Sequence, residues 1–166
     1  MDRFPRLAAQ LLCTVATLTA CAGVPTESGR TPFAARLDGQ DFVASQTDFS
    51  LYGGGSHLLI SGVRAGVAGS SRQVSVQLGG WHGPGTYLLR DPSGGNLGFV
   101  ADEGTGAQPA GHWETSTTET GQVVITVFDA NAKRVAGTFS FRARDANGNV
   151  ITVSEGGFDD RYVVDP

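Results

Sequence analysis

The sequence is poor in cysteine and in charged residues, and each shortage excludes a class of protein. Of the 166 residues, two are cysteines, Cys13 and Cys21, and 17% are charged. The formal net charge is −4, and the acidic residues are spread along the chain. Because nucleic acid attracts basic surfaces, no nucleic acid is expected as a partner. The apolar stretch from Leu7 to Leu18 is shorter than the roughly 20 residues of a transmembrane helix, which argues against a permanent helical span.

The first part of the chain has the order of a signal peptide. Two arginines precede the apolar stretch, and the tetrapeptide Leu18-Thr19-Ala20-Cys21 closes it. This tetrapeptide resembles the lipobox of bacterial lipoproteins, in which the cysteine is acylated and becomes the first residue after cleavage. We therefore expect residues 1–20 to be removed and Cys21 to carry the lipid that holds the protein on a membrane. The alternative is an ordinary secretory signal that is cut near Ala20 or Ala22.

Cleavage before Cys21 would determine how the rest of the chain is organised. Cys21 would then be the one remaining cysteine, so a buried core and no intrachain disulfide must stabilise the fold. Residues 21–31 are polar and contain proline and glycine, which predicts a flexible tether. Residues 32–166 have the length of one domain. Ala22 after the lipidated cysteine resembles the default for the outer membrane, so we expect the protein in the cell envelope at the outer membrane, on its periplasmic face or at the cell surface.

The spacing of apolar residues predicts a domain built almost entirely of strands. No window has the helical spacing of i, i+3, i+4 and i+7, whereas short segments alternate apolar and polar residues between glycine, aspartate and asparagine clusters. The clearest example places Val135, Phe139, Phe141 and Ala143 on one face and Arg142 on the other. About nine such strands are expected. The predicted fold class is all-β, a single antiparallel sandwich or barrel, between which the sequence does not choose.

The residues of two turns are specific enough that the geometry of each turn can be predicted. Asp38-Gly39 separates two alternating runs and predicts a tight hairpin. At Asn147-Gly148, a two-residue turn would put Ile151 and Val153 on the same face as the arginines of the preceding strand. A three-residue loop over 146–148 instead pairs Asp145 with Asn149 and returns both apolar residues to the buried face, so burial selects this register.

Three motifs together resemble a known family. They are Phe33-x-Ala-x-Leu-Asp-Gly39, the stretch Lys133-Arg-Val-Ala-Gly-Thr-Phe-Ser-Phe141, and Gly157-Phe158-Asp159. They are similar to motifs of uncharacterised bacterial lipoproteins, in which a lipobox precedes one all-β domain of unknown function. The resemblance covers most of residues 32–162 and implies a fold and a location. It implies no activity and no functional residues, because the family has none assigned.

No motif predicts catalysis, a metal or a cofactor. The histidines, His57, His82 and His112, are not spaced to direct two ligands at one metal ion. The run from Asp145 to Asn149 begins like a calcium loop, but its later glycine and glutamate positions do not match. No Gly-x-Ser-x-Gly elbow is present, and the glycine run before Ser56 is interpreted as a turn.

Two tryptophans beside loop signals are the candidate binding residues. Trp81-His82 lies between glycines, and His112-Trp113 follows a proline and a glycine. Tryptophan offers a flat surface with one polar edge, which suits a sugar ring or a peptide, but it also fills cores. We therefore expect a non-enzymatic envelope module that binds a glycan or an envelope protein. The alternatives are a purely structural lipoprotein, or a hydrolase in which His82 or His112 meets a carboxylate such as Asp102 or Glu114.

Overall fold

The computed structural model describes residues 32–66, 69–90, 95–104 and 109–165, and these residues form twelve strands. The strands are β1 (Phe33–Leu37), β2 (Gln40–Val43), β3 (Gln46–Tyr52), β4 (His57–Ala65), β5 (Ser71–Gly79), β6 (Gly85–Leu89), β7 (Leu97–Glu103), β8 (Pro109–Glu114), β9 (Gly121–Asp129), β10 (Arg134–Arg144), β11 (Val150–Arg161) and β12 (Val163–Val164). The predicted signal peptide, Cys21 and the tether lie outside the described residues. The described part of the chain contains no helix with the length and hydrophobicity needed to cross a membrane.

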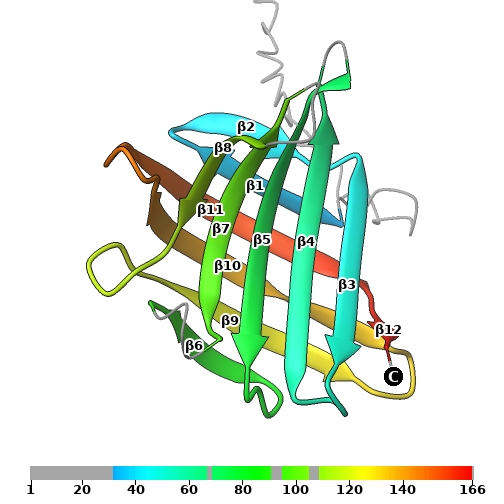
Figure 1. Ribbon diagram of the computed structural model, residues 1–166. Helices are drawn as coiled ribbons and strands as arrows, with labels where there is room; N and C mark the ends of the chain where they lie inside the picture. Colours follow the sequence, from blue (N-terminus) through cyan, green and yellow to red (C-terminus); the bar gives the residue numbers. More distant parts are fainter. Residues whose placement is uncertain (1–31, 67–68, 91–94, 105–108, 166) are drawn as a thin grey trace, which may run out of the picture.

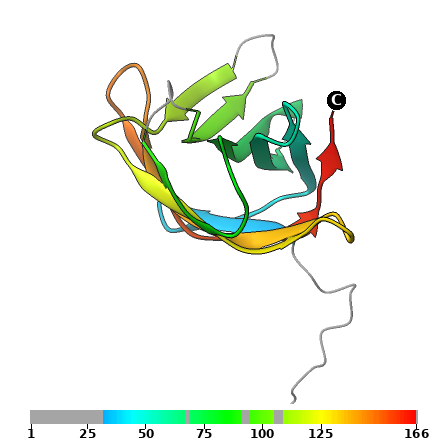
Figure 2. The ribbon, with the colours of Figure 1, turned by 90° about the horizontal axis from the view of Figure 1, so that it is seen from below.

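All twelve strands belong to one hydrogen-bonded sheet that curls over on itself. Its front half has the order β12, β3, β4, β5, β7, β8, and its back half has the order β6, β9, β10, β11, β1, β2. The strands of the back half run obliquely behind those of the front half (Figure 1), and the view from below shows the two halves facing each other (Figure 2). The all-β prediction is confirmed. The architecture is a half-barrel with two strands, β8 and β12, that the sequence pattern did not predict.

Two weak joints connect the halves of the sheet. β8 meets β10 at a single residue pair, Glu114 opposite Arg144. At the other margin, β12 pairs in parallel with β3 over two residues, Val163 opposite Ser50 and Val164 opposite Leu51. Every other pairing between described strands is antiparallel.

The core fills the space between the two halves. Inner-facing apolar residues of both halves are buried, and the predicted inner face of β10, including Phe139, Phe141 and Ala143, is confirmed. Aromatic rings bridge the halves: Phe49 of β3 lies 5.9 Å from Phe158 of β11 and 6.5 Å from Phe33 of β1, measured between ring centroids. Edge-to-face packing of this kind adds to the free energy gained by burying the rings.

Glycines inside the front strands make room for these rings. A Cβ atom on Gly62 of β4 would overlap the ring of Phe33, and one on Gly98 of β7 would lie 2.8 Å from a ring carbon of Phe141. Both glycines face the interior, because their neighbours across the sheet include the buried Val74 and Val76. Glycine weakens an isolated strand, but here it lets the two halves approach closely.

Both predicted turns are confirmed. Leu37 pairs with Gln40, and Asp38 and Gly39 have φ values of 47° and 80°, as a two-residue type I′ hairpin requires. At the tip of the β10–β11 hairpin, the Asp145 N–H donates to the Asn149 carbonyl over 3.0 Å, so the loop is 146–148. Ala143 then pairs with Ile151 and Phe141 with Val153, which places both apolar residues in the core.

The Asp145 side chain also holds this loop. Its carboxylate accepts hydrogen bonds from the Asn147 N–H at 2.9 Å, the Asn149 N–H at 2.7 Å and the Asn149 side-chain amide at 2.8 Å. The side-chain hydrogen bond from Asn149 is the main reason that the pKa of Asp145 lies below its ordinary value. These bonds use the carboxylate that the calcium-loop motif would need, so the hairpin interpretation stands.

Gly148→Ala tests the loop geometry. Gly148 has φ +89°, and the nearest atom to an added Cβ would be 3.7 Å away, so the substitution is costly only through its backbone conformation. We expect a loss of about 1 kcal/mol or more in the free energy of unfolding, measured by urea denaturation. Gly157→Ala is the matched control, because nothing lies within 4 Å of its Cβ position and its φ is not in the left-handed region. Equal stability of the two variants would contradict the loop assignment.

Candidate functional site

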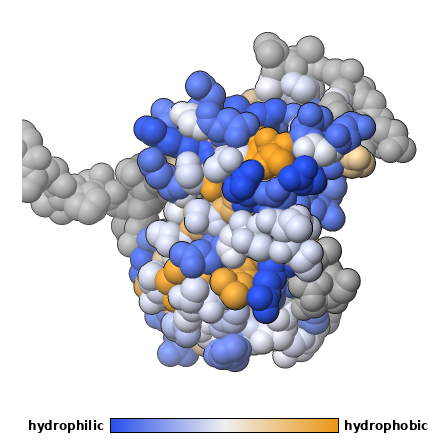
Figure 3. Space-filling model, turned by 90° about the vertical axis from the view of Figure 1, so that its left-hand side faces the viewer, coloured by the Kyte–Doolittle hydropathy of each residue, from blue (hydrophilic) through white to orange (hydrophobic). Residues whose placement is uncertain are grey.

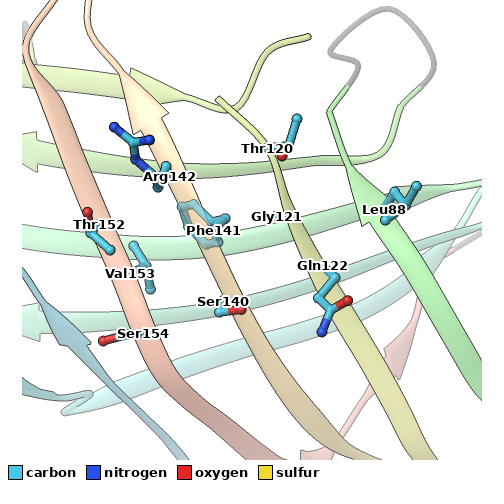
Figure 4. A pocket seen from close by; sticks show the side chains of 10 residues that line it. All are labelled: Leu88, Thr120, Gly121, Gln122, Ser140, Phe141, Arg142, Thr152, Val153 and Ser154. Atoms are coloured by element: carbon cyan, nitrogen blue, oxygen red, sulfur yellow. The ribbon is translucent and has the colours of Figure 1, made fainter. Parts of the chain in front are cut away.

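A groove of about 410 Å³ crosses the outer face of the back half. Its volume falls within the usual range for small-molecule sites. Figure 4 shows Arg142 near one end, Gln122, Ser140 and Ser154 toward the other, and Leu88 on the neighbouring strand β6. The complete lining is Leu88, Thr120, Gly121, Gln122, Ser140, Phe141, Arg142, Thr152, Val153 and Ser154.

The alternation of each strand determines the chemistry of this groove. In β10, Ser140 and Arg142 face outward because Phe139, Phe141 and Ala143 face the core. Short hydroxyl side chains on β10 and β11 leave the sheet surface low, while Leu88 on the edge strand β6 stands 52% exposed beside them. The groove therefore combines hydrogen-bonding side chains with one apolar wall.

A second hollow of about 310 Å³ shares Gln122 and Ser140 with the groove and extends it toward Glu155 and Gly156. The register of β10 against β11 shifts between Phe139 and Phe141, and Glu155 has φ 51°, so a bulge interrupts the ladder here. Bulges increase the local twist of a sheet. The extended groove follows this twist across three strands.

Positive charge is concentrated at the Arg142 end. Glu119 is 4% exposed, and its Oε1 atom accepts a hydrogen bond from Arg144. Its Oε2 atom lies 3.4 Å from Nε of Arg142 but has no hydrogen-bond partner. One carboxylate is thus shared by two guanidinium groups, which leaves an excess of one positive charge.

The opposite end of the extended groove is acidic. The Glu155 carboxylate lies 3.4 Å from Nε of Arg36, and the same nitrogen is 3.3 Å from Asp41. One guanidinium is therefore shared by two carboxylates. The groove has opposite electrostatic character at its two ends.

One side of the molecule has a largely polar surface. Figure 3 shows the side that faces left in Figure 1, where hydrophilic and neutral residues dominate and hydrophobic residues form small separate spots. The exposed large hydrophobic residues of the described chain lie on edge strands, each of which pairs with one neighbour. They are Val43 on β2, Leu88 on β6, and Val163 and Val164 on β12. Leu88 alone among them borders the groove.

Trp81, one of the predicted ligand-binding residues, is part of the core. Its side chain is 8% exposed, and its ring lies 4.6 Å from that of Phe128 at an interplanar angle of 75°. The indole N–H donates to the Gly55 carbonyl over 3.0 Å. His82, the next residue, is exposed, and its ring packs edge-on against Tyr87 at 5.3 Å. The indole ring of Trp81 is thus packed against Phe128, and its N–H already has a backbone acceptor.

His112 and Trp113 lie on opposite faces of β8. Trp113 pairs with the buried Val100, is partly buried and packs against the core. His112 is exposed on the outer face, lies 5.8 Å from the ring of Phe99, and its Nε2 atom is 2.8 Å from Oε1 of Glu114. Val100 in turn pairs with Val74, so Trp113 lies on the order of 20 Å along the strands from Trp81, and the two tryptophans do not form one site.

Two of the contacts bear on the hydrolase alternative. The structure brings His112 and Glu114 together, as that alternative requires, on the open outer face of the front half. Ser56 Oγ lies 2.9 Å from His57 Nδ1, but the hydroxyl donates to the Gly53 carbonyl over 2.7 Å. The Ser56 hydroxyl thus already has a backbone acceptor, and no acidic side chain contacts the His57 ring among the described residues to orient it as a base. Among the described residues, no group of three histidine, cysteine or acidic side chains could hold a metal ion.

The fold and the groove define a curled all-β domain with an open groove on the outer face of its sheet. The chain belongs to the family described as a domain of unknown function, DUF6252, whose model matches residues 30–160. This confirms the predicted relationship to a domain family without an assigned function. No curated protein matches the chain, and no solved structure matches it.

Fluorescence quenching tests the placement of the tryptophans. In Trp113→Phe, the remaining indole of Trp81 should resist quenching by iodide, because it is 8% exposed and hydrogen bonded. The wild type should be quenched more, since Trp113 is only partly buried. Trp81→Ala should lower the free energy of unfolding by about 3–5 kcal/mol. Quenching of Trp113→Phe as strong as that of free tryptophan would contradict the structure.

Proposed function

We propose that the protein is a lipid-anchored lipoprotein of the bacterial cell envelope whose domain binds a ligand rather than transforming a substrate. The observation that carries the binding part is the open groove lined by hydroxyl, amide and guanidinium groups across β9, β10 and β11. The anchoring part rests on the sequence before residue 22. The family has no assigned activity, so the proposal rests on the chain itself.

The support for anchoring is the agreement of three sequence features. A basic start, a short apolar stretch and a small residue before Cys21 occur in the order of a lipoprotein signal. Two or more acyl chains on one cysteine provide stable attachment, because each buried methylene contributes about 0.8 kcal/mol. The domain would then be tethered to the membrane through residues 21–31.

The support for binding is the chemistry of the groove. Gln122, Ser140 and Thr152 offer both donors and acceptors, and they lie on adjacent strands held in register by the core beneath. Side chains on rigid strands position polar groups more accurately than side chains on loops. A polar ligand could replace the water of this surface and keep its hydrogen bonds.

Anchoring is tested with Cys21→Ser. After expression in the bacterial host, the wild type should enter the detergent phase of a Triton X-114 extraction, because its acyl chains are apolar. Cys21→Ser should stay in the aqueous phase, and Cys13→Ser should behave as the wild type. Equal partitioning of Cys21→Ser and the wild type would refute lipidation at Cys21.

Binding is tested with a matched pair of glutamine variants. Gln122 lies in the groove and Gln46 lies on β3, and both are exposed on strands. On a glycan array probed with the full chain in detergent, Gln122→Trp should abolish the signals that the wild type gives, because an indole fills the groove. Gln46→Trp should retain them.

The outcomes of this experiment separate the candidate functions. Signals that survive Gln122→Trp would place binding elsewhere. No wild-type signal on the array, or in a pull-down with isolated cell envelopes, would favour the purely structural lipoprotein.

A further inference from the structure

We propose that the groove recognises an acidic saccharide and that Arg142 binds its carboxylate. This inference rests on the proposed binding function and names the class of ligand. It follows from the hydrogen bonds of Arg142, from the buried Glu119 beside it, and from the hydroxyl and amide groups along the groove.

Arg142 has an unused donor edge at the groove. Its Nε atom faces Glu119 at 3.4 Å, whereas its two terminal nitrogens make no hydrogen bond to any residue in the described ranges. Arginine binds a carboxylate best through two parallel N–H donors, and such charge-assisted pairs are about twice as strong as neutral ones. The exposed edge of Arg142 supplies those two donors.

Glu119 explains why Arg142, rather than Arg144, is the anchor. Arg144 is engaged twice, by the Glu119 carboxylate and by the Gly148 carbonyl, to which its Nη1 atom donates over 3.0 Å. The buried Glu119 carboxylate attracts the Nε side of Arg142 and limits how far the guanidinium can turn. Arg142 is therefore held in position without being neutralised, since both guanidinium groups share one negative charge.

The rest of the groove matches the hydroxyl groups of a sugar. Ser140, Thr152, Ser154 and the Gln122 amide line it, and each can donate and accept hydrogen bonds. Leu88 provides the apolar wall against which the C–H face of a sugar ring can pack. Glu155 lies at the far end of the extended groove and repels a carboxylate there, so the acid group is oriented toward Arg142.

The test compares an acidic oligosaccharide with its neutral methyl ester. The probes are trigalacturonic acid and its fully methyl-esterified form, titrated calorimetrically into the full chain in detergent. The wild type should bind the acid at least about tenfold more tightly than the ester, since a hydrogen-bonded charge pair contributes that much or more. The preference should shrink as the salt concentration rises.

Charge-matched variants identify the residue that is responsible. Arg142→Gln should reduce the preference for the acid to nearly none, and Arg142→Lys should restore part of it. Arg161→Gln, which removes the same charge from an exposed site outside the groove, should leave the preference unchanged. Thermal unfolding should be similar in Arg142→Lys and Arg161→Gln, whereas Arg142→Gln should unfold at a lower temperature because the buried Glu119 loses one of its two cationic partners.

Failure of this inference can be told apart from failure of the proposed function. Equal binding of acid and ester, or an acid preference that survives Arg142→Gln, overturns the role of Arg142 while binding in the groove stands. Failure of the wild type to bind either probe also overturns the proposal that the ligand is an acidic saccharide. The glycan array with Gln122→Trp then decides whether the groove binds anything else.

Discussion

Packing of phenylalanine rings between the two halves of the sheet is the interaction on which the structure depends. The hydrogen bonds that join the halves are few: one residue pair between β8 and β10, and two between β12 and β3. Further links are the hydrogen bonds from Thr47 of β3 to Asp160 of β11 and from Arg64 of β4 to the Asp41 carbonyl of β2, both 2.8 Å long. Residues 32–166 contain no cysteine, so no disulfide within the domain reinforces the curl. Burial of the rings must therefore keep the halves together.

This dependence explains the arrangement of the outer face. Inward and outward residues alternate along β10, so the aromatic residues that enter the core are interleaved with Thr138, Ser140 and Arg142 on the outer face. The low outer surface beside Leu88 is the result. The groove is thus a by-product of the same alternation that builds the core, and its floor is rigid because the core supports it.

The strands and turns could be predicted where the local pattern was decisive. Asp38-Gly39 has the residues that a type I′ turn needs, and the register at 146–148 follows because any other pairing would expose Ile151 and Val153. β8 escaped prediction because proline and glycine begin it, and β12 because it is two residues long. The curl could not be predicted, since it depends on contacts between residues far apart in the sequence.

The candidate site was less accessible to prediction than the fold. Trp81 stands among glycines, as a loop residue would, and its burial depends on Phe128, which is distant in the sequence. Arg142 was predicted to face outward, but outward-facing polar residues such as Arg142 and Ser140 are ordinary on a half-buried strand. Their significance emerges only when β9 and β11 lie beside β10. The shared carboxylate of Glu119 gave no sequence signal at all.

The pairing of β1 with β11 has a consequence for when the molecule can fold. Phe33 near the start of the domain lies opposite Phe158 near its end, so the central ladder of the back half cannot form until almost the whole chain is available. Contacts of such long sequence separation slow folding, because the loop must close before the contact is gained. A nascent chain of this kind stays incompletely folded while it is being made. That delay suits the export we propose, because a chain that has not yet closed its sheet can still be threaded through a translocation channel.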